Sequence, residues 1–263
     1  MHTSIARALI AASVLTAAGA AAEVKTRELT YTQDKTTLQG FVAWDDAVKG
    51  KRPGVLVIHE WWGHNQHARN QAIRLAKAGY VGFAVDMYGK GKLAEHPNDA
   101  KAMSGELRKD PATVKARFEA ALAELKKDPN VDPKKIGVVG YCMGGSIALE
   151  MARAGADLQA IATFHAGLSS PEKPAAKGAV KPRILVNNGG ADTFIPQAAI
   201  DAFKKEMADA GARVEVISYP GAKHGFTNPD AGKHGMESLA YDAAADKASW
   251  EASMKMFKEA FGT

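Results

Sequence analysis

Short apolar runs that alternate with helical segments are the feature of this sequence that most limits its possible folds. Three nearly unbroken apolar runs are typical of strands buried on both faces: Val55 to Ile58, Tyr80 to Val85 and Ile136 to Val139. Helical patterns separate these runs, one from Asn65 to Ala78 and one that starts at Asp110-Pro111 and ends before Pro129. This alternation predicts an α/β fold with a mostly parallel sheet covered by helices on both faces.

The flanking segments extend the same pattern. Residues from Val24 to Trp44 alternate loosely between β-formers and polar groups, with a break at Gln33-Asp34-Lys35, which predicts an N-terminal antiparallel hairpin at a sheet edge. Further strands are expected at Leu158 to Thr163, Ile184 to Asn187 and Val214 to Tyr219, and further helices at Pro196 to Ala210 and Met236 to Phe261. No repeat or linker interrupts the pattern, so we expect residues 23–263 to form a single domain.

The first 22 residues have a different character. His2 and Arg7 precede an uncharged, Ala-rich run from Ala8 to Ala22, which ends in small residues before Glu23. The run is shorter than the roughly 20 apolar residues that span a bilayer. Residues 1–22 are therefore predicted to be a cleaved signal peptide of a secreted or periplasmic protein, with the mature chain starting at Glu23 or Ala21.

Charge and cysteine content exclude several classes of function. The net charge is +5, but acidic and basic residues are interspersed and no basic block appears, so nucleic-acid binding is not expected. Cys142 is the single cysteine, which excludes an intramolecular disulfide and a zinc site built from several thiolates. A thiol-transfer protein would lack a resolving cysteine.

The cysteine occupies a motif with a chemical meaning. Gly140-Tyr141-Cys142-Met143-Gly144-Gly145 follows a buried strand and precedes a predicted helix, which is the pattern of a nucleophile elbow with cysteine in place of serine. Glycines are needed two positions to either side because the turn brings backbone segments close together. The helix N-terminus favours a thiolate, and the Met143 N–H can donate to an oxyanion. An inert buried cysteine is the alternative interpretation.

A nucleophile of this kind needs a base and an orienting carboxylate. In this fold they follow the nucleophile in the order acid, then histidine, each after a later strand. Asp192 follows the strand that ends at Asn187, and His224 follows the strand that ends at Tyr219. Since the carboxyl ends of parallel strands share one sheet edge, we expect Cys142, Asp192 and His224 to meet there.

A histidine-rich segment, His59 to His67, directly follows the first buried strand. Glu60, His64 and His67 could together bind a metal, but the zincin spacing is absent because position 63 is glycine. The prediction is an active-site loop without metal, in which the Trp61 N–H is the second oxyanion donor.

Five segments together resemble the dienelactone hydrolases, cysteine-dependent members of the α/β-hydrolase fold. They surround Glu60, Asp86 to Lys90, Cys142, Asp192 and His224 and occur in the family's order over nearly the whole mature chain. The resemblance implies hydrolysis of small carboxylic esters or lactones without a cofactor, with Cys142 as nucleophile, His224 as base and Asp192 as its partner. It also implies that Glu60 is a resting-state partner of the thiol, and that Trp61, Tyr88 and Lys90 contact the substrate.

The sequence departs from the family at the two arginines that hold the substrate carboxylate, which are replaced by Lys90 and Asn228. A lysine keeps the charge but loses the bidentate fork, and asparagine carries no charge. Small neutral esters or lactones are therefore expected to be at least as good substrates as anionic dienelactones. A non-catalytic exported binding protein that retains the fold is the alternative function.

Overall fold

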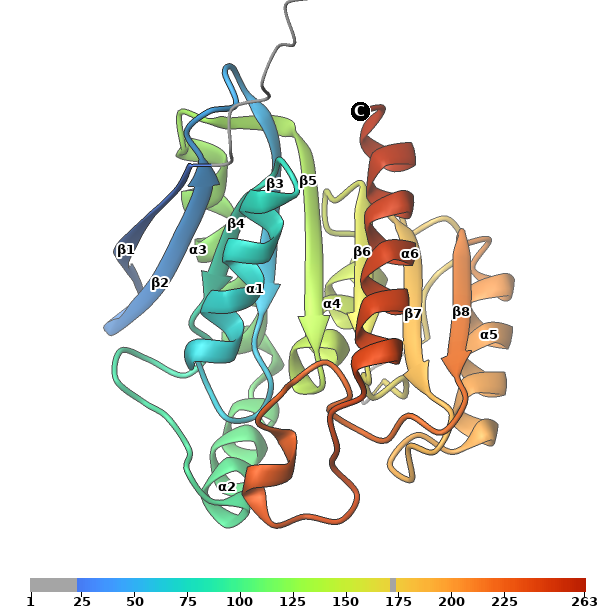
Figure 1. The fold of residues 1–263 in the computed structure, drawn as a ribbon. Helices are drawn as coiled ribbons and strands as arrows, with labels where there is room; N and C mark the ends of the chain where they lie inside the picture. The colour runs from blue at the N-terminus through green and yellow to red at the C-terminus, as the bar shows by residue number, and fades with distance from the viewer. Residues whose placement is uncertain (1–22, 171–173) are drawn as a thin grey trace, which may run out of the picture.

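An eight-stranded sheet forms the centre of the molecule in the computed structural model, which describes residues 23–170 and 174–263 (Figure 1). The strand order is β1-β2-β4-β3-β5-β6-β7-β8. The strands are β1 (Val24–Gln33), β2 (Thr36–Asp45), β3 (Arg52–Ile58), β4 (Val81–Val85), β5 (Val131–Tyr141), β6 (Ala160–Phe164), β7 (Arg183–Gly189) and β8 (Val214–Tyr219). From β4 to β8 all neighbouring strands are parallel, as the apolar runs predict.

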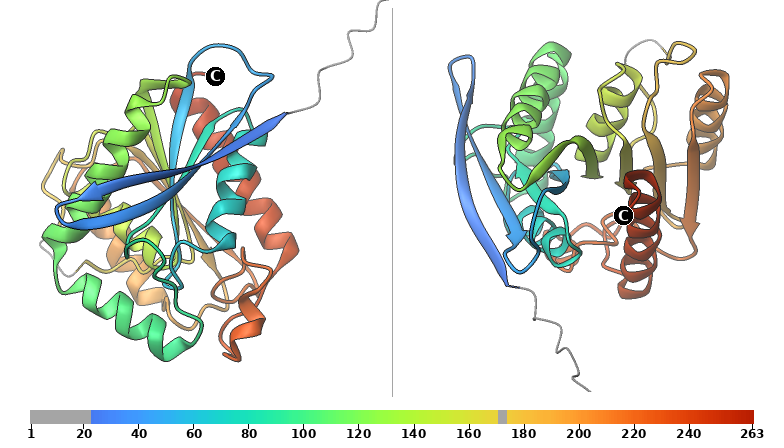
Figure 2. Two further views of the ribbon diagram at one scale, coloured as in Figure 1. Left: turned by 90° about the vertical axis from the view of Figure 1, so that its left-hand side faces the viewer. Right: turned by 90° about the horizontal axis from the view of Figure 1, so that it is seen from above.

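Helices cover both faces of the sheet (Figures 1 and 2). The helices are α1 (Gln66–Lys77), α2 (Pro97–Arg108), α3 (Pro111–Lys127), α4 (Met143–Arg153), α5 (Gln197–Asp209) and α6 (Ala243–Phe261). One core cluster packs α1 and α6 against one face, and the other packs α3, α4 and α5 against the opposite face. Every residue of β3, β4 and β6 is buried, which explains why their sequences are continuous rather than alternating apolar runs.

The N-terminal hairpin adds the antiparallel edge. β1 pairs antiparallel with β2 along its whole length, and β2 pairs antiparallel with β4. Asp34 in the connecting turn has a φ of 49°, a conformation that Asp tolerates better than most residues. The predicted hairpin and fold class are confirmed.

The predicted start of the last helix was wrong, and one helix was not predicted. The helix expected to begin at Met236 begins at Ala243, because the Asp242 carboxylate accepts hydrogen bonds from the N–H groups of Ala244 and Ala245 and so caps it there. The preceding residues instead form a short 3₁₀ helix, Ala231–His234, and a loop that returns to the sheet edge. Helix α2 was not predicted. Its N-cap is His96, which is not one of the residue types preferred at that position and makes no side-chain capping hydrogen bond.

The predicted signal peptide, residues 1–22, lies outside the described residues. Within the part of the chain that the structure describes, no helix is long and apolar enough to cross a membrane.

Candidate active site

Cys142 lies at the sharp turn between β5 and α4. Its φ of 51° and ψ of −117° are unusual for a non-glycine residue, and they place the side chain at the carboxyl edge of the sheet. Cys142 is the N-cap of α4, so the positive end of the helix lies at the sulfur.

The two glycines that flank the turn are there because backbone segments approach closely. A Cβ on Gly144 would lie 2.2 Å from the carbonyl oxygen of Ile58, at the end of β3. A Cβ on Gly140 would lie 2.5 Å from the carbonyl oxygen of Gly144. Since real Cβ atoms essentially never come so close to backbone, both positions exclude any side chain, as the elbow pattern indicates.

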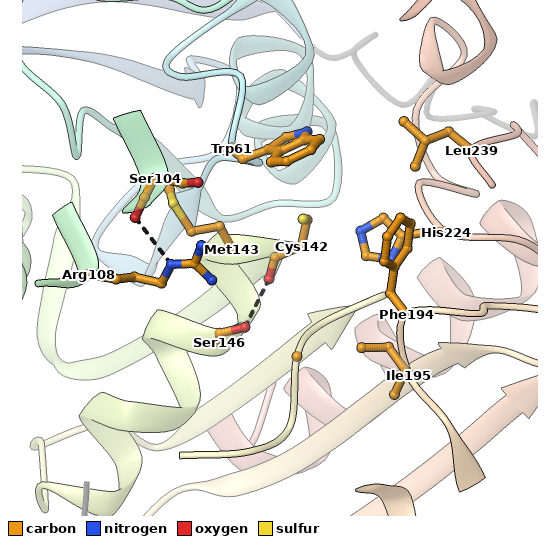
Figure 3. A pocket seen from close by; sticks show the side chains of 11 residues that line it. Trp61, Ser104, Arg108, Cys142, Met143, Ser146, Phe194, Ile195, His224 and Leu239 are labelled. Carbon is orange, nitrogen blue, oxygen red and sulfur yellow. Dashed lines mark hydrogen bonds between the residues drawn. The ribbon is translucent and has the colours of Figure 1, made fainter. Parts of the chain in front are cut away.

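Asp192 and His224 meet Cys142 at this edge from the loops after β7 and β8 (Figure 3). The His224 Nδ1 lies 2.8 Å from Asp192 Oδ2, and the Asp192 side chain is fully buried. The second oxygen of Asp192 accepts a hydrogen bond from the N–H of Phe194 at 2.9 Å, which fixes the carboxylate. An Nδ1–H that donates to Asp192 leaves Nε2 available to exchange a proton with the thiol.

The charges around His224 favour its protonated form. Burial opposes protonation, but the negative charges of Cys142 and Asp192 and the hydrogen bonds to both outweigh it and raise the pKa of His224 to about 10. An imidazolium beside a thiolate is the arrangement that activates a cysteine nucleophile.

A second histidine, His165, packs against the ring of His224. It follows β6, is fully buried, and lies with its ring centroid 4.9 Å from that of His224. Its Nε2 is 2.9 Å from Thr227 Oγ1. Burial and the neighbouring His224 hold the pKa of His165 well below its ordinary value, so its neutral ring can support His224 without competing for the proton. His165 was not predicted as a site residue from the sequence, although its position at the end of a buried strand was an available signal.

The N–H groups of Trp61 and Met143, which the sequence predicts to be the oxyanion donors, make no backbone hydrogen bond among the described residues. The Met143 N–H belongs to the first turn of α4, where no acceptor exists within the helix. Tyr88 holds both residues, since its hydroxyl donates to the Trp61 carbonyl at 2.9 Å and contacts Met143 Sδ at 3.3 Å.

A cavity of about 250 Å³ opens at the sulfur (Figure 3). Its lining consists of Trp61, Ser104, Arg108, Cys142, Met143, Ser146, Gly167, Phe194, Ile195, His224 and Leu239. The volume fits a small molecule. Three of these residues were not predicted from the sequence. Ser104 and Arg108 lie on helix α2, which was itself not predicted. Phe194 is an isolated Phe in a loop, which carries no sequence signal.

The other predicted contact residues lie elsewhere. Tyr88 is buried behind Trp61, and Lys90 is exposed and does not line the cavity. The backbone N–H of Lys90 donates to the Thr37 carbonyl, which keeps this segment against the start of β2. Of the residues expected to contact the substrate, Trp61 alone lines the cavity.

Glu60 is buried near the triad and is not among the residues that line the cavity. Its Oε2 accepts a hydrogen bond from Asn228 Nδ2 at 2.7 Å, and its Oε1 lies 4.0 Å from His165 Nε2. No hydrogen bond joins Glu60 to Cys142 in the described residues. The carboxylate therefore packs behind the loop that carries His224.

The histidines that follow β3 pack within the protein and do not line the cavity. His59 Nε2 accepts a hydrogen bond from the Met87 N–H at 3.2 Å, and the ring of His67 packs edge-on against Tyr141. Burial lowers the pKa of His64 to about 4, which keeps its ring neutral. Within residues 23–170 and 174–263, no group of three or more His, Cys, Asp or Glu side chains is arranged to hold a metal ion.

Comparison with known proteins identifies a family that matches most of the chain. The model of the dienelactone hydrolase family matches residues 38–261. Protein usf of Aquifex pyrophilus is 30% identical over 233 residues, which cover 87% of this chain and 96% of that protein.

Two solved structures are similar over almost their full lengths. The dienelactone hydrolase-like promiscuous phosphotriesterase P91, from metagenomic libraries, is 37% identical with a TM-score of 0.86, covering 91% of this chain and 99% of P91. The structure described as m3DLH is 40% identical, also with a TM-score of 0.86, covering 90% of this chain and 99% of its own.

Proposed function

Because the chain belongs to the dienelactone hydrolase family, we propose that it hydrolyses small carboxylic esters or lactones through an acyl-cysteine intermediate on Cys142, His224 and Asp192. The 2.8 Å contact between His224 Nδ1 and Asp192 Oδ2, beside a cysteine held at an elbow, is the observation that carries this proposal. It leaves Nε2 facing the sulfur, as nucleophilic catalysis requires.

The first half of the reaction is transfer of the acyl group to sulfur. The Cys142 thiolate attacks the ester carbonyl, and the negative charge that develops on its oxygen is bound by the N–H groups of Trp61 and Met143. When the intermediate collapses, the bond to the alcohol oxygen breaks and that oxygen takes the proton from His224.

The second half releases the acid. Water attacks the thioester carbonyl and gives a proton to His224 Nε2, while the same two N–H groups bind the oxyanion again. The carbon–sulfur bond then breaks, which returns the thiolate and the imidazolium. Asp192 holds the ring of His224 in one orientation and stabilises its positive charge throughout.

Turnover of a panel of chromogenic esters and lactones by the wild-type chain and by Cys142→Ala tests this function. We expect the wild type to turn over members of the panel and Cys142→Ala to lose this activity. Trapping a thioester on Cys142 by rapid acid quench, followed by mass spectrometry, tests the intermediate. Absence of turnover, with ligand binding retained in Cys142→Ala, would favour the non-catalytic binding protein instead.

The similarity to P91, which is described as a promiscuous phosphotriesterase, adds one class to this panel. Aryl phosphotriesters present a phosphoryl oxygen that the Trp61 and Met143 N–H groups could bind as they would an ester oxygen. Release of the aryl alcohol that depends on Cys142 would support this as a secondary activity.

We further propose that the protein is exported and acts outside the cytoplasm. The charged start, the apolar run and the small residues before Glu23 support this proposal.

A further inference from the structure

Arg108, the last residue of α2, contributes a guanidinium to the cavity wall. Among the described residues that line the cavity, none is an Asp or Glu, and Arg108 is the only Lys or Arg. In Figure 3 its side chain runs along one wall and its guanidinium points toward the centre of the pocket. Besides the imidazole of His224, a substrate in this cavity therefore meets the permanent positive charge of Arg108.

The hydrogen bonds of Arg108 leave most of its guanidinium free. Nε donates to the Ser104 carbonyl at 3.1 Å, and this bond fixes the side chain along the last turn of α2. Within the described residues, no carboxylate forms an ion pair with Arg108. By contrast, the neighbouring Lys109 pairs with Glu106, and Arg153 pairs with two glutamates. The two terminal nitrogens of Arg108 remain available for the bidentate binding of an anion.

The position of Arg108 relative to His224 indicates which part of an ester it would meet. In Figure 3 Arg108 and His224 lie on opposite sides of Cys142. The leaving alcohol oxygen must lie at His224, because it takes its proton from this residue. The acyl portion therefore extends across Cys142 toward Arg108.

The polarity of the two cavity walls is consistent with this orientation of the ester. Ser104, Ser146 and the thioether side chain of Met143 accompany Arg108 on its side of the sulfur, whereas Phe194, Ile195 and Leu239 lie on the side of His224 (Figure 3). Apolar side chains suit an apolar alcohol, and hydroxyl groups beside a guanidinium suit an oxygen-rich, anionic group.

We infer that Arg108 selects esters whose acyl portion carries an anionic group, such as monoesters of short dicarboxylic acids. The inference rests on the proposed ester hydrolysis and names its substrate class. This cation comes from α2 and not from position 90 or 228, where the family has its two arginines. It therefore favours an anion at a different place in the pocket from the substrate carboxylate of the family.

A matched pair of ester series tests this inference. One series is monoethyl succinate, glutarate and adipate, and the other is the ethyl alkanoates of matching length; kcat/KM is measured as ethanol release. In the wild type the ratio of anionic to neutral kcat/KM should be highest for the chain whose carboxylate reaches Arg108. In Arg108→Gln this ratio should fall by about tenfold or more, since a charge-assisted bidentate hydrogen bond is lost. Arg108→Lys should restore part of it.

Lys109→Gln is the matched control, because it removes one positive charge from the adjacent position, where the side chain pairs with Glu106. It should leave the ratio unchanged. Raising the ionic strength should lower the wild-type ratio. An equal loss in Lys109→Gln, or an unchanged ratio in Arg108→Gln, would overturn the inference.

The outcomes separate this inference from the proposed function. If Cys142→Ala hydrolyses both series as fast as the wild type, the proposed cysteine mechanism fails. If hydrolysis of both series depends on Cys142 but the ratio of anionic to neutral kcat/KM does not depend on Arg108, the mechanism stands and the inference fails.

An ester with its carboxylate on the alcohol portion tests the assigned orientation. Hydrolysis of such an ester, the acetate of 4-hydroxybenzoate, should show no dependence on Arg108. A dependence as large as that of the monoesters would contradict the orientation.

Discussion

Glu60 Oε2 accepts a hydrogen bond of 2.7 Å from Asn228 Nδ2, although 168 residues separate the two in the sequence. The contact joins the loop after β3 to the loop that carries His224, and both side chains are buried. It holds a buried carboxyl group against the loop that carries His224. A negative charge at such a place would act on neighbouring groups through the protein interior rather than through water.

Glu60→Gln tests whether this charge restrains the thiol. We expect Cys142 to react several-fold faster with iodoacetamide in the variant, because a nearby negative charge opposes thiolate formation. Glu215→Gln, which changes an exposed carboxylate on β8, serves as the control. Unchanged or slower labelling in Glu60→Gln would reject the resting-state role predicted for Glu60.

Asp192→Asn should change the pH dependence of hydrolysis as well as its rate. Asp192 raises the pKa of His224, so its loss should lower that pKa and move the alkaline limb of kcat/KM from near pH 10 to lower pH. We also expect kcat to fall by about 10²- to 10⁴-fold, because the ring loses its orientation. Asp201→Asn, an exposed carboxylate on α5, should show neither change.

The triad should also behave as one unit in a double variant. If Cys142→Ala combined with His224→Ala were much slower than either single variant, the two residues would be acting independently.

Gly144→Ala should destabilise the fold by about 3 kcal/mol, because the added Cβ would collide with the Ile58 backbone. Urea unfolding of the variant and the wild type measures the difference. Gly105→Ala is the control: Gly105 lies within α2, where an added Cβ meets nothing within 4 Å. That change should stabilise the fold by about 0.5–1 kcal/mol, through helix propensity. Equal effects of the two substitutions would contradict the close approach at Gly144.

Lys90→Ala should leave the kcat/KM of both neutral and anionic esters unchanged, because the side chain is exposed and outside the cavity. Steady-state kinetics on neutral lactones and anionic dienelactones checks this and also tests the expectation that neutral substrates are at least as good. A strong preference for the dienelactones, lost in Lys90→Ala, would contradict both.

Sequencing the N-terminus of protein purified from the native cells tests the proposed export. The mature chain is expected to begin at Glu23 or Ala21. A soluble cytoplasmic form that retains Met1 would disprove cleavage.

The sequence by itself determined the parallel sheet and the positions of Cys142, Asp192 and His224 along it. Buried parallel strands require continuous apolar runs, and an elbow requires glycines at fixed offsets, so both leave local patterns that can be read without a structure. The acid and the histidine follow later strands in an order that the sheet topology sets, so this order can also be recognised from the sequence.

The tertiary structure decided which other side chains reach the sulfur. Lys90 belongs to a motif shared with the family, yet it is exposed and does not line the cavity, whereas Arg108 belongs to no motif and lines it. Helix α2 has a weak N-terminal signal, and its last turn reaches the cavity only because the chain after β4 crosses the sheet edge before α3 begins. A contact of this kind depends on how distant segments pack and leaves no periodicity or spacing in the local sequence.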